Sequence, residues 1–212
     1  MAVFGSLKDI DLLELLPLLS GQKGKLILTP QKGTEFTLYI DGDKVVCVQK
    51  GRNGLPPLRV QEQLFGIING EGDANFEFVP GGTPKRCYGQ LELRLDELVL
   101  KLSTLRDEVK NLKNSLPHPR AIFALANPAP AFKDTQLAAF VNESWSLLEK
   151  GTSAEEIAAK QGIPLDHVRY MLYRLRALGV IKPLPKATQP EKRKGLASRL
   201  LGLIKRRFGL AS

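Results

Sequence analysis

The chain of 212 residues is poor in the residues from which metal, redox and catalytic sites are usually built: it has two cysteines, two histidines, two methionines and one tryptophan. Cys47 and Cys87 stand far apart and neither has a second cysteine nearby, so the sequence predicts neither a disulfide framework nor a zinc site. His118 and His167 have no neighbouring Ser or Cys with an acid that could orient the imidazole for catalysis. We therefore expect no bound metal, no cofactor and no enzymatic activity.

Long hydrophobic runs are also missing. No apolar run approaches the roughly twenty residues that span a bilayer, and the first residues lack a basic region that leads into a long apolar segment. These two features predict a soluble protein in the cytoplasm. Hydrophobic residues make up 43% of the chain, which is enough for one sizeable core or two small ones, and the pattern along the chain favours two.

Positive charge is abundant but unevenly distributed. The formal net charge is +9, yet residues 1–90 hold ten basic and ten acidic residues, whereas the last thirty residues hold eight basic residues and one acidic residue. Most of the net charge therefore belongs to the C-terminal tail. Because polyanion binding depends on local charge density, the charge of the whole chain does not predict nucleic-acid binding by the rest of it.

The segment 152–181 has the pattern of a helix-turn-helix. Thr152 or Ser153 can cap a first helix, and acidic residues follow in its first turn, where they favour the positive end of the helix dipole. Gly162 supplies the backbone freedom of a tight turn, and Ile163 is expected to fill the angle between the two helices. A second helix is predicted from about Leu165.

The second helix should present a basic and aromatic face. Val168, Leu172 and Leu175 recur at spacings of four and three, which predicts a buried stripe and leaves Arg176 and its polar neighbours toward solvent. Arginine and tyrosine side chains suit contacts with phosphates and base edges. The predicted DNA-binding residues are His167, Arg169, Tyr170, Tyr173 and Arg174.

The flanking segments resemble the winged helix-turn-helix superfamily, so residues 133–185 are expected to form one such domain. An apolar-periodic helix is predicted from Gln136 to Lys150, with Leu137, Phe140, Val141, Trp145 and Leu148 inward, and Gly179-Val180-Ile181 begins a short strand. Winged helices also serve as protein-binding modules, and Asp166 at the start of the second helix would repel phosphate. Binding to duplex DNA and binding to protein therefore both stay open.

Residues 1–90 predict a small antiparallel sheet with two helices. Asp41-Gly42 marks a tight hairpin between two of the strands, and the first helix is leucine-dense and bends or ends at Pro17. The expected elements are a helix over 9–19, strands over 25–29, 35–40 and 44–49, a helix over 59–69 and a strand over 75–79.

This half of the chain resembles the PATAN domain of bacterial signalling proteins. The resemblance rests on Phe4-Gly5-Ser6-Leu7, Gly24-Lys25-Leu26-Ile27-Leu28, the stretch from Leu38 to Val46, and Gly72-Asp73-Ala74-Asn75-Phe76-Glu77-Phe78. It covers about 110 residues when the following helix is included. The resemblance implies an α+β fold and an adaptor or sensory role that involves a protein partner.

Residues 91–116 carry the clearest periodicity in the chain and predict a connector helix. Leucines and one valine recur at alternating spacings of four and three, which is the heptad pattern of a coiled coil, most simply a homodimer. The alternative is a helix packed on the sheet of its own subunit, which we expect for its first turns. The residues expected in the dimer seam are Leu102, Leu105, Val109 and Leu112.

Two segments are expected to lie outside these units. Residues 117–132 contain four prolines and predict an extended linker. Residues 186–212 predict a basic amphipathic tail, which could bind an anionic membrane surface, an acidic partner, additional DNA phosphates or its own protein. Its basic residues are Lys192, Arg193, Lys194, Arg199, Lys205, Arg206 and Arg207.

Together these features predict a dimeric bacterial regulator with a PATAN-like adaptor or sensory domain, a connector helix and a winged helix that binds duplex DNA. The main alternative is a signalling scaffold whose winged helix and basic tail bind protein or membrane.

Overall fold

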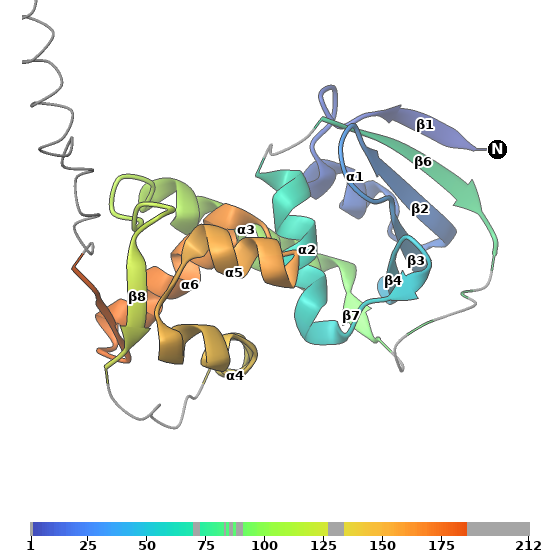
Figure 1. Ribbon diagram of the computed structural model, residues 1–212. Coiled ribbons are helices and arrows are strands. Elements are labelled where there is room, and N and C mark those ends of the chain that lie inside the picture. Colours follow the sequence, from blue (N-terminus) through green and yellow to red (C-terminus); the bar gives the residue numbers. More distant parts are fainter. Residues whose placement is uncertain are drawn as a thin grey trace, which may run out of the picture.

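The computed structural model describes residues 2–69, 73–82, 84, 87, 91–126 and 134–185. Over these residues the chain is a mixed α+β protein with a seven-stranded antiparallel sheet, a three-stranded antiparallel sheet and six helices. The large sheet belongs to an N-terminal lobe and the small sheet to a C-terminal lobe (Figure 1). The predicted basic tail lies outside the described residues. Every helix within them is too short or too polar to cross a membrane.

The large sheet confirms the strands expected in the first half of the chain. Its strand order is β1-β6-β2-β3-β4-β5, and β7 also pairs with β4. The predicted hairpin turn is present between β3 and β4, where Gly42 has a positive φ of 63° that favours glycine. The strands are β1 (Val3–Ser6), β2 (Gln22–Pro30), β3 (Phe36–Gly42), β4 (Lys44–Lys50), β5 (Asn53–Gly54), β6 (Ala74–Pro80) and β7 (Leu93–Arg94).

Three helices cover one face of this sheet: α1 (Leu12–Leu18), α2 (Pro57–Ile68) and α3 (Leu95–Asn111) (Figure 1). The Asp11 side chain caps α1 by accepting a hydrogen bond from the backbone N–H of Leu13 at 3.1 Å. Pro17 lies in the last turn of α1, where the sequence predicts a bend or an end. Pro57 begins α2, a position that tolerates proline because its missing N–H would have no partner within the helix.

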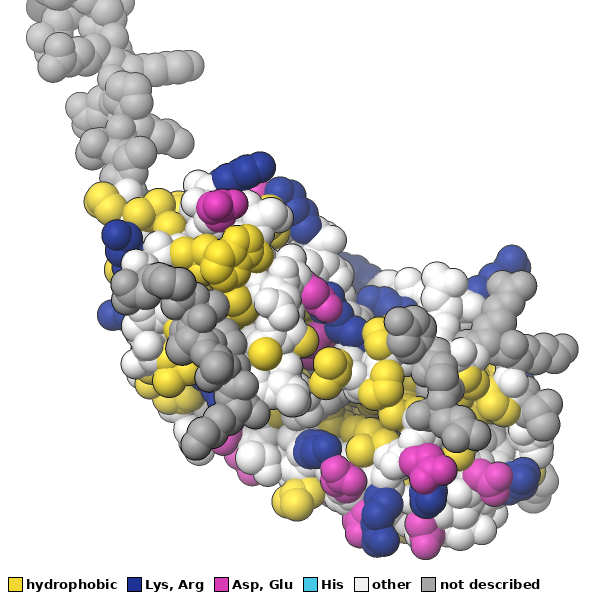
Figure 2. Space-filling model, turned by 90° about the horizontal axis from the view of Figure 1, so that it is seen from below, with side chains coloured by type: hydrophobic (Ala, Val, Ile, Leu, Met, Phe, Trp, Pro, Cys, Tyr) yellow, Lys and Arg dark blue, Asp and Glu magenta, His cyan; other side chains and the backbone are white. Residues whose placement is uncertain are grey.

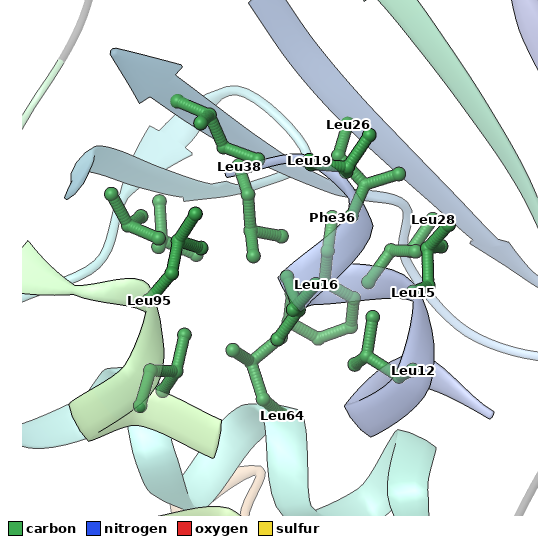
Figure 3. Close-up of a cluster of buried hydrophobic side chains, with 14 of the residues drawn as sticks. Leu12, Leu15, Leu16, Leu19, Leu26, Leu28, Phe36, Leu38, Leu64 and Leu95 are labelled. Carbon is green, nitrogen blue, oxygen red and sulfur yellow. The ribbon is translucent and has the colours of Figure 1, made fainter. Parts of the chain in front are cut away.

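A leucine-rich core joins these helices to the sheet. Figure 3 shows leucines of α1 and of β2 pointing toward one another, with Leu64 of α2 and Leu95 of α3 closing the cluster. Each fully buried leucine contributes about 1.5–3 kcal/mol relative to an exposed one, so this cluster is the main source of stability in the N-terminal lobe. Gly24 allows β2 to approach β6 closely, because a Cβ there would lie 2.6 Å from the Phe78 ring.

A second core begins on another face of α2 and along the later turns of α3. Phe65 of α2 and the later residues of α3, Leu105 and Val109, pack among side chains of the C-terminal lobe. Because α3 meets both cores, Leu102, Leu105 and Val109 are buried within a single chain, and Leu112 is half-buried beside the second core. The expectation that these residues lie in a seam between two chains is therefore wrong. The heptad spacing reports a single stripe that the N-terminal lobe covers at its start and the C-terminal lobe covers at its end.

The C-terminal lobe contains β8 (Ile122–Leu125), α4 (Thr135–Lys150), β9 (Thr152–Ser153), α5 (Ala154–Gln161), α6 (Leu165–Ala177) and β10 (Ile181–Pro183), and its strand order is β10-β8-β9. Residues 122–125, which the sequence places in an extended linker, are extended as β8, and Phe123 is buried in the second core, so this part of the segment belongs to the small sheet. The inward position expected for Trp145 is also wrong. Its side chain is 38% exposed, and Ser144 faces the core in its place.

The two cysteines form a disulfide, so the expectation of no disulfide is wrong. The Cα atoms of Cys47 and Cys87 lie 5.6 Å apart. The physical reason is the path of the chain after β6: it returns to pair β7 with β4, the strand that carries Cys47. A separation of forty residues in sequence therefore becomes a contact in the fold.

Candidate functional site

The pair of helices α5 and α6 has the local structure that the sequence predicts. The Ser153 hydroxyl caps α5 by accepting a hydrogen bond from the backbone N–H of Glu156 at 3.2 Å. Gly162 ends α5 in the left-handed conformation, with φ 64°, and Ile163 is buried in the turn. Residues Val168, Leu172 and Leu175 of α6 are fully buried, as expected.

The sequence predicts that the polar face of α6 faces solvent, but part of this face is buried. His167 is 1% exposed and Tyr170 is 7% exposed, because α6 packs on both α2 and α3. The expectation that these two side chains are free to contact DNA is therefore wrong for this arrangement. Helical spacing shows which residues share a face of α6, but it does not show that a second element covers the face opposite the first stripe.

The predicted arginines are held by partners within the chain. Arg169 donates hydrogen bonds to the Asp166 carboxylate at 2.6 Å and to the carbonyl of Pro117 at 2.8 Å. Arg174 pairs with Asp134 at 2.8 Å and lies over the Tyr170 ring. Tyr173 is half-buried beside the second core. Four of the five predicted DNA-binding residues therefore lie where α6 meets α2, α3, the segment after α3 and the start of α4: His167, Arg169, Tyr170 and Arg174.

A buried polar cluster lies where α6 meets α2. The Nε2 atom of His167 is 3.8 Å from Oε1 of Glu62, and Glu62 accepts a hydrogen bond from Arg59 at 2.9 Å. The first distance is longer than a hydrogen bond, so the attraction between His167 and Glu62 is one of charge and requires a protonated ring. Burial acts to raise the pKa of the Glu62 carboxyl, but the nearby His167 and Arg59 outweigh burial and hold this pKa below its ordinary value.

A second polar contact links α6 to α3. The Tyr170 hydroxyl donates a hydrogen bond to the Glu108 carboxylate. Burial and this hydrogen bond raise the pKa of the Tyr170 phenol to about 12. The hydroxyl therefore stays protonated at neutral pH and remains a donor to Glu108.

A cleft of about 1030 Å³ opens at this junction, between α3, α6 and the first residues of α2 and α4. Seen from below, hydrophobic side chains gather in a hollow between the two lobes (Figure 2). Leu58 and Leu100 lie at the cleft and are 45% and 66% exposed, whereas Tyr170 and Arg174 line it from α6. Polar and apolar side chains therefore both line the cleft.

The sequence reasoning missed the contribution of α2. Arg59, Glu62 and Gln63 connect this helix to the C-terminal lobe, and Phe65 enters the second core. The apolar stripe of Val60, Leu64, Ile67 and Ile68 predicts the side of α2 that faces the sheet. Phe65 lies off that stripe, and a large aromatic residue on the supposedly polar side of a helix is the one signal in the sequence that a second face is covered.

Within the described ranges, no group of three or more His, Cys, Asp or Glu side chains could hold a metal ion. Comparison with known protein families, with curated proteins and with solved structures found no match.

Proposed function

We propose that this chain is a non-enzymatic regulatory protein in which the C-terminal lobe, the predicted winged helix, acts as a protein-interaction module. The observation that carries the proposal is the burial of His167 and Tyr170 of α6 against α2 and α3. A helix that reads DNA must present its side chains to the major groove. Here the corresponding face already serves as a protein contact.

Polar contacts between α2 and two parts of the C-terminal lobe, helix α4 and the turn after α5, support this proposal. Gln63 of α2 donates a hydrogen bond to the carbonyl of Gly162 at 2.9 Å. Arg59 pairs with Glu143 of α4, and Gln136 of α4 donates a hydrogen bond to Gln61 at 2.6 Å. Hydrogen bonds spread over an apolar contact give the two lobes a defined relative orientation, which is what a protein-binding surface requires.

A DNA-binding regulator is the second candidate. The observation that favours it is the local structure of α5 and α6, where a capped helix, a turn at Gly162 and a helix with two arginines follow in the order expected of a helix-turn-helix. In this case the N-terminal lobe would hold the DNA-binding face closed, and the protein would bind DNA only after the lobes separate.

A DNA-binding assay on the full chain separates the two candidates. Phe65→Asp introduces a charge into the second core at the junction and should loosen the docking of α6, whereas Leu58→Asp adds the same charge at an exposed position of the same helix. We expect equal affinity of the two variants for duplex DNA, measured by fluorescence anisotropy at two salt concentrations. The basic tail is present in both, so its salt-dependent, non-specific contribution cancels.

A milder pair of substitutions guards against unfolding of Phe65→Asp. The double variant Gln63→Ala/Asn69→Ala removes the hydrogen bond to Gly162 and that from Asn69 to Asp166 at 3.4 Å without adding a charge. The DNA affinity of Phe65→Asp is compared with that of Leu58→Asp, and the affinity of the double variant with that of the unmodified chain. An increase of about tenfold or more in either comparison would show that α6 is a DNA-binding helix that the N-terminal lobe covers. The proposal of a protein-interaction module would then be wrong.

A further inference from the structure

A smaller pocket of about 250 Å³ lies on another side of the junction. Its walls come from the loop between β2 and β3, from β4 and α2, and from the turn between α5 and α6. The two lobes therefore build the pocket together. Lys32 and Lys50 line it, and none of its other ten lining residues is acidic.

Lys50 enters the pocket as a cation that no described carboxylate neutralises. Its Nζ donates a hydrogen bond to Gln63 at 2.7 Å and lies 5.5 Å from the centre of the Phe36 ring. An ammonium group has three donors, and this hydrogen bond uses one of them. Burial lowers the pKa of Lys50, which means that its charged form lacks the stabilisation that an anion would supply.

Gln63 fixes the position of Lys50 relative to the C-terminal lobe. Its side-chain oxygen accepts from Lys50, and its side-chain nitrogen donates to the carbonyl of Gly162 at 2.9 Å. Gln63 is itself buried. The amide is therefore fully oriented by its two partners, and the ammonium group of Lys50 is held close to the turn that precedes α6.

The surroundings of the pocket favour negative charge. Lys32 forms no ion pair within the described ranges of the chain, and it lines the same pocket as Lys50 from the loop between β2 and β3. Pro164, the residue before α6, lines the pocket and provides no side-chain cap for the first backbone N–H groups of that helix. The nearest acid on α6, Asp166, is engaged by Arg169 and Asn69.

We propose that this pocket binds the phosphate group of a small anion, with Lys50 and Lys32 as its charged contacts. The volume accommodates a phosphate and a small attached group. The charged donors are lysines, which act as point charges toward tetrahedral oxyanions, whereas the planar fork of an arginine that matches a carboxylate is absent from the described lining. Because both lobes contribute to the pocket, a bound phosphate stabilises their docked arrangement.

Calorimetric titration of the full chain tests the proposal, with inorganic phosphate, glycerol phosphate and acetate as probes at constant ionic strength. We expect saturable binding of inorganic phosphate in the millimolar range or tighter, weaker binding of acetate, and a higher unfolding temperature with phosphate present. Tighter binding of glycerol phosphate identifies a phosphate ester as the ligand, whereas equal binding identifies free phosphate.

Three variants locate the site. Lys50→Met keeps the apolar part of the side chain and should weaken phosphate binding about tenfold or more, because it removes a charge-assisted hydrogen bond. Lys32→Glu, in an exposed loop where the fold does not depend on it, should weaken binding at least as strongly by repulsion. Lys110→Gln removes an exposed charge from α3, outside the pocket, and should leave the affinity unchanged.

If Lys50→Met does not unfold cooperatively, and is therefore not properly folded, Lys32→Glu alone tests whether phosphate binds in this pocket. The proposal is overturned if the unmodified chain shows no saturable binding at 10 mM phosphate, on the order of the weakest affinity that supports a specific site. It is also overturned if acetate binds as tightly as phosphate, or if Lys32→Glu binds phosphate as the unmodified chain does. These readouts do not involve DNA, so they succeed or fail independently of the role proposed for the C-terminal lobe.

Discussion

Glu62 and His167 show how a residue that looks exposed in the sequence becomes part of an interior. Both side chains are almost fully buried, and they come from different lobes. Removing Glu62 leaves the buried His167 without its acidic neighbour, whereas removing His167 leaves Glu62 with Arg59 as its one remaining partner in this cluster. Loss of a partner from a buried polar cluster costs more than the intact contact contributes. The junction therefore depends on both residues being present.

The lowered pKa of Glu62 leads to a prediction about acid. A carboxyl whose pKa is lower in the folded state stabilises the fold above its ordinary value of 4.5, and this contribution is lost as the pH falls through the lowered folded value. We expect Glu62→Gln to lose roughly 1–3 kcal/mol at neutral pH. We also expect its stability to fall less than that of the unmodified chain on acidification. Urea unfolding at a series of pH values measures both effects.

Glu143→Gln is the matched control, because Glu143 pairs with the same Arg59 but is much more exposed. It should lose less than about 1 kcal/mol, as is usual for exposed ion pairs. If the two variants unfold with the same free energy at every pH, the buried cluster does not stabilise the junction.

At the scale of the element, α3 shows that a heptad pattern does not distinguish contact with a second chain from contact within the same chain. A helix with apolar residues at alternating spacings of four and three presents a continuous stripe, and the stripe has the same spacing whether a second chain or the same chain covers it. In this fold the first turns of α3 face the sheet and the later turns face the C-terminal lobe. The α2 helix instead divides its burial between two faces, with Val60 and Leu64 in the first core and Phe65 in the second.

This division predicts the effect of shortening a buried side chain in the later turns of α3. Leu105→Ala should destabilise the chain by about 2–5 kcal/mol, because Leu105 is 5% exposed and its removal leaves a cavity in the second core. The molecular mass in solution should not change. Urea unfolding and sedimentation measure these two quantities.

Leu100→Ala in the same helix is the control, since Leu100 is exposed and its truncation should change stability by no more than about 0.5 kcal/mol. A dimeric mass for the unmodified chain that becomes monomeric in Leu105→Ala would restore the coiled-coil interpretation. Homodimerisation itself stays a prediction.

For the whole molecule, the disulfide links a strand of the large sheet to the crossover that leads into α3. It closes a loop of about forty residues, so it restricts the unfolded chain and should contribute about 4 kcal/mol to stability. A disulfide persists most readily in an oxidising compartment, and the cytoplasmic location expected from the sequence stays a prediction.

Reduction should therefore lower the free energy of unfolding by roughly 2–4 kcal/mol, measured in urea with and without a phosphine reductant. The double variant Cys47→Ala/Cys87→Ala serves as the control, since reductant should have no effect on it. A reductant effect of the same size in that variant, or none in the unmodified chain, would contradict a stabilising disulfide.

Local features of this protein follow from the sequence because they depend on neighbouring residues. The hairpin at Gly42, the cap at Ser153 and the turn at Gly162 each arise from backbone conformation or hydrogen bonds within a few positions. The strand and helix periods are equally local, and they predicted the main strands of the large sheet and helices α2 to α6 to within a few residues.

The tertiary structure alone decided which surfaces meet. Periodicity shows that a stripe is buried, but the identity of the covering element depends on the path of the whole chain. For this reason the sequence-based expectations did not include four features of the fold. These are the burial of His167, the covering of α3 by both lobes, the pairing of Cys47 with Cys87 and the lysine-lined pocket. Each of these features joins residues that lie at least forty positions apart in the sequence or belong to different lobes. A pattern among neighbouring residues does not predict contacts of this kind.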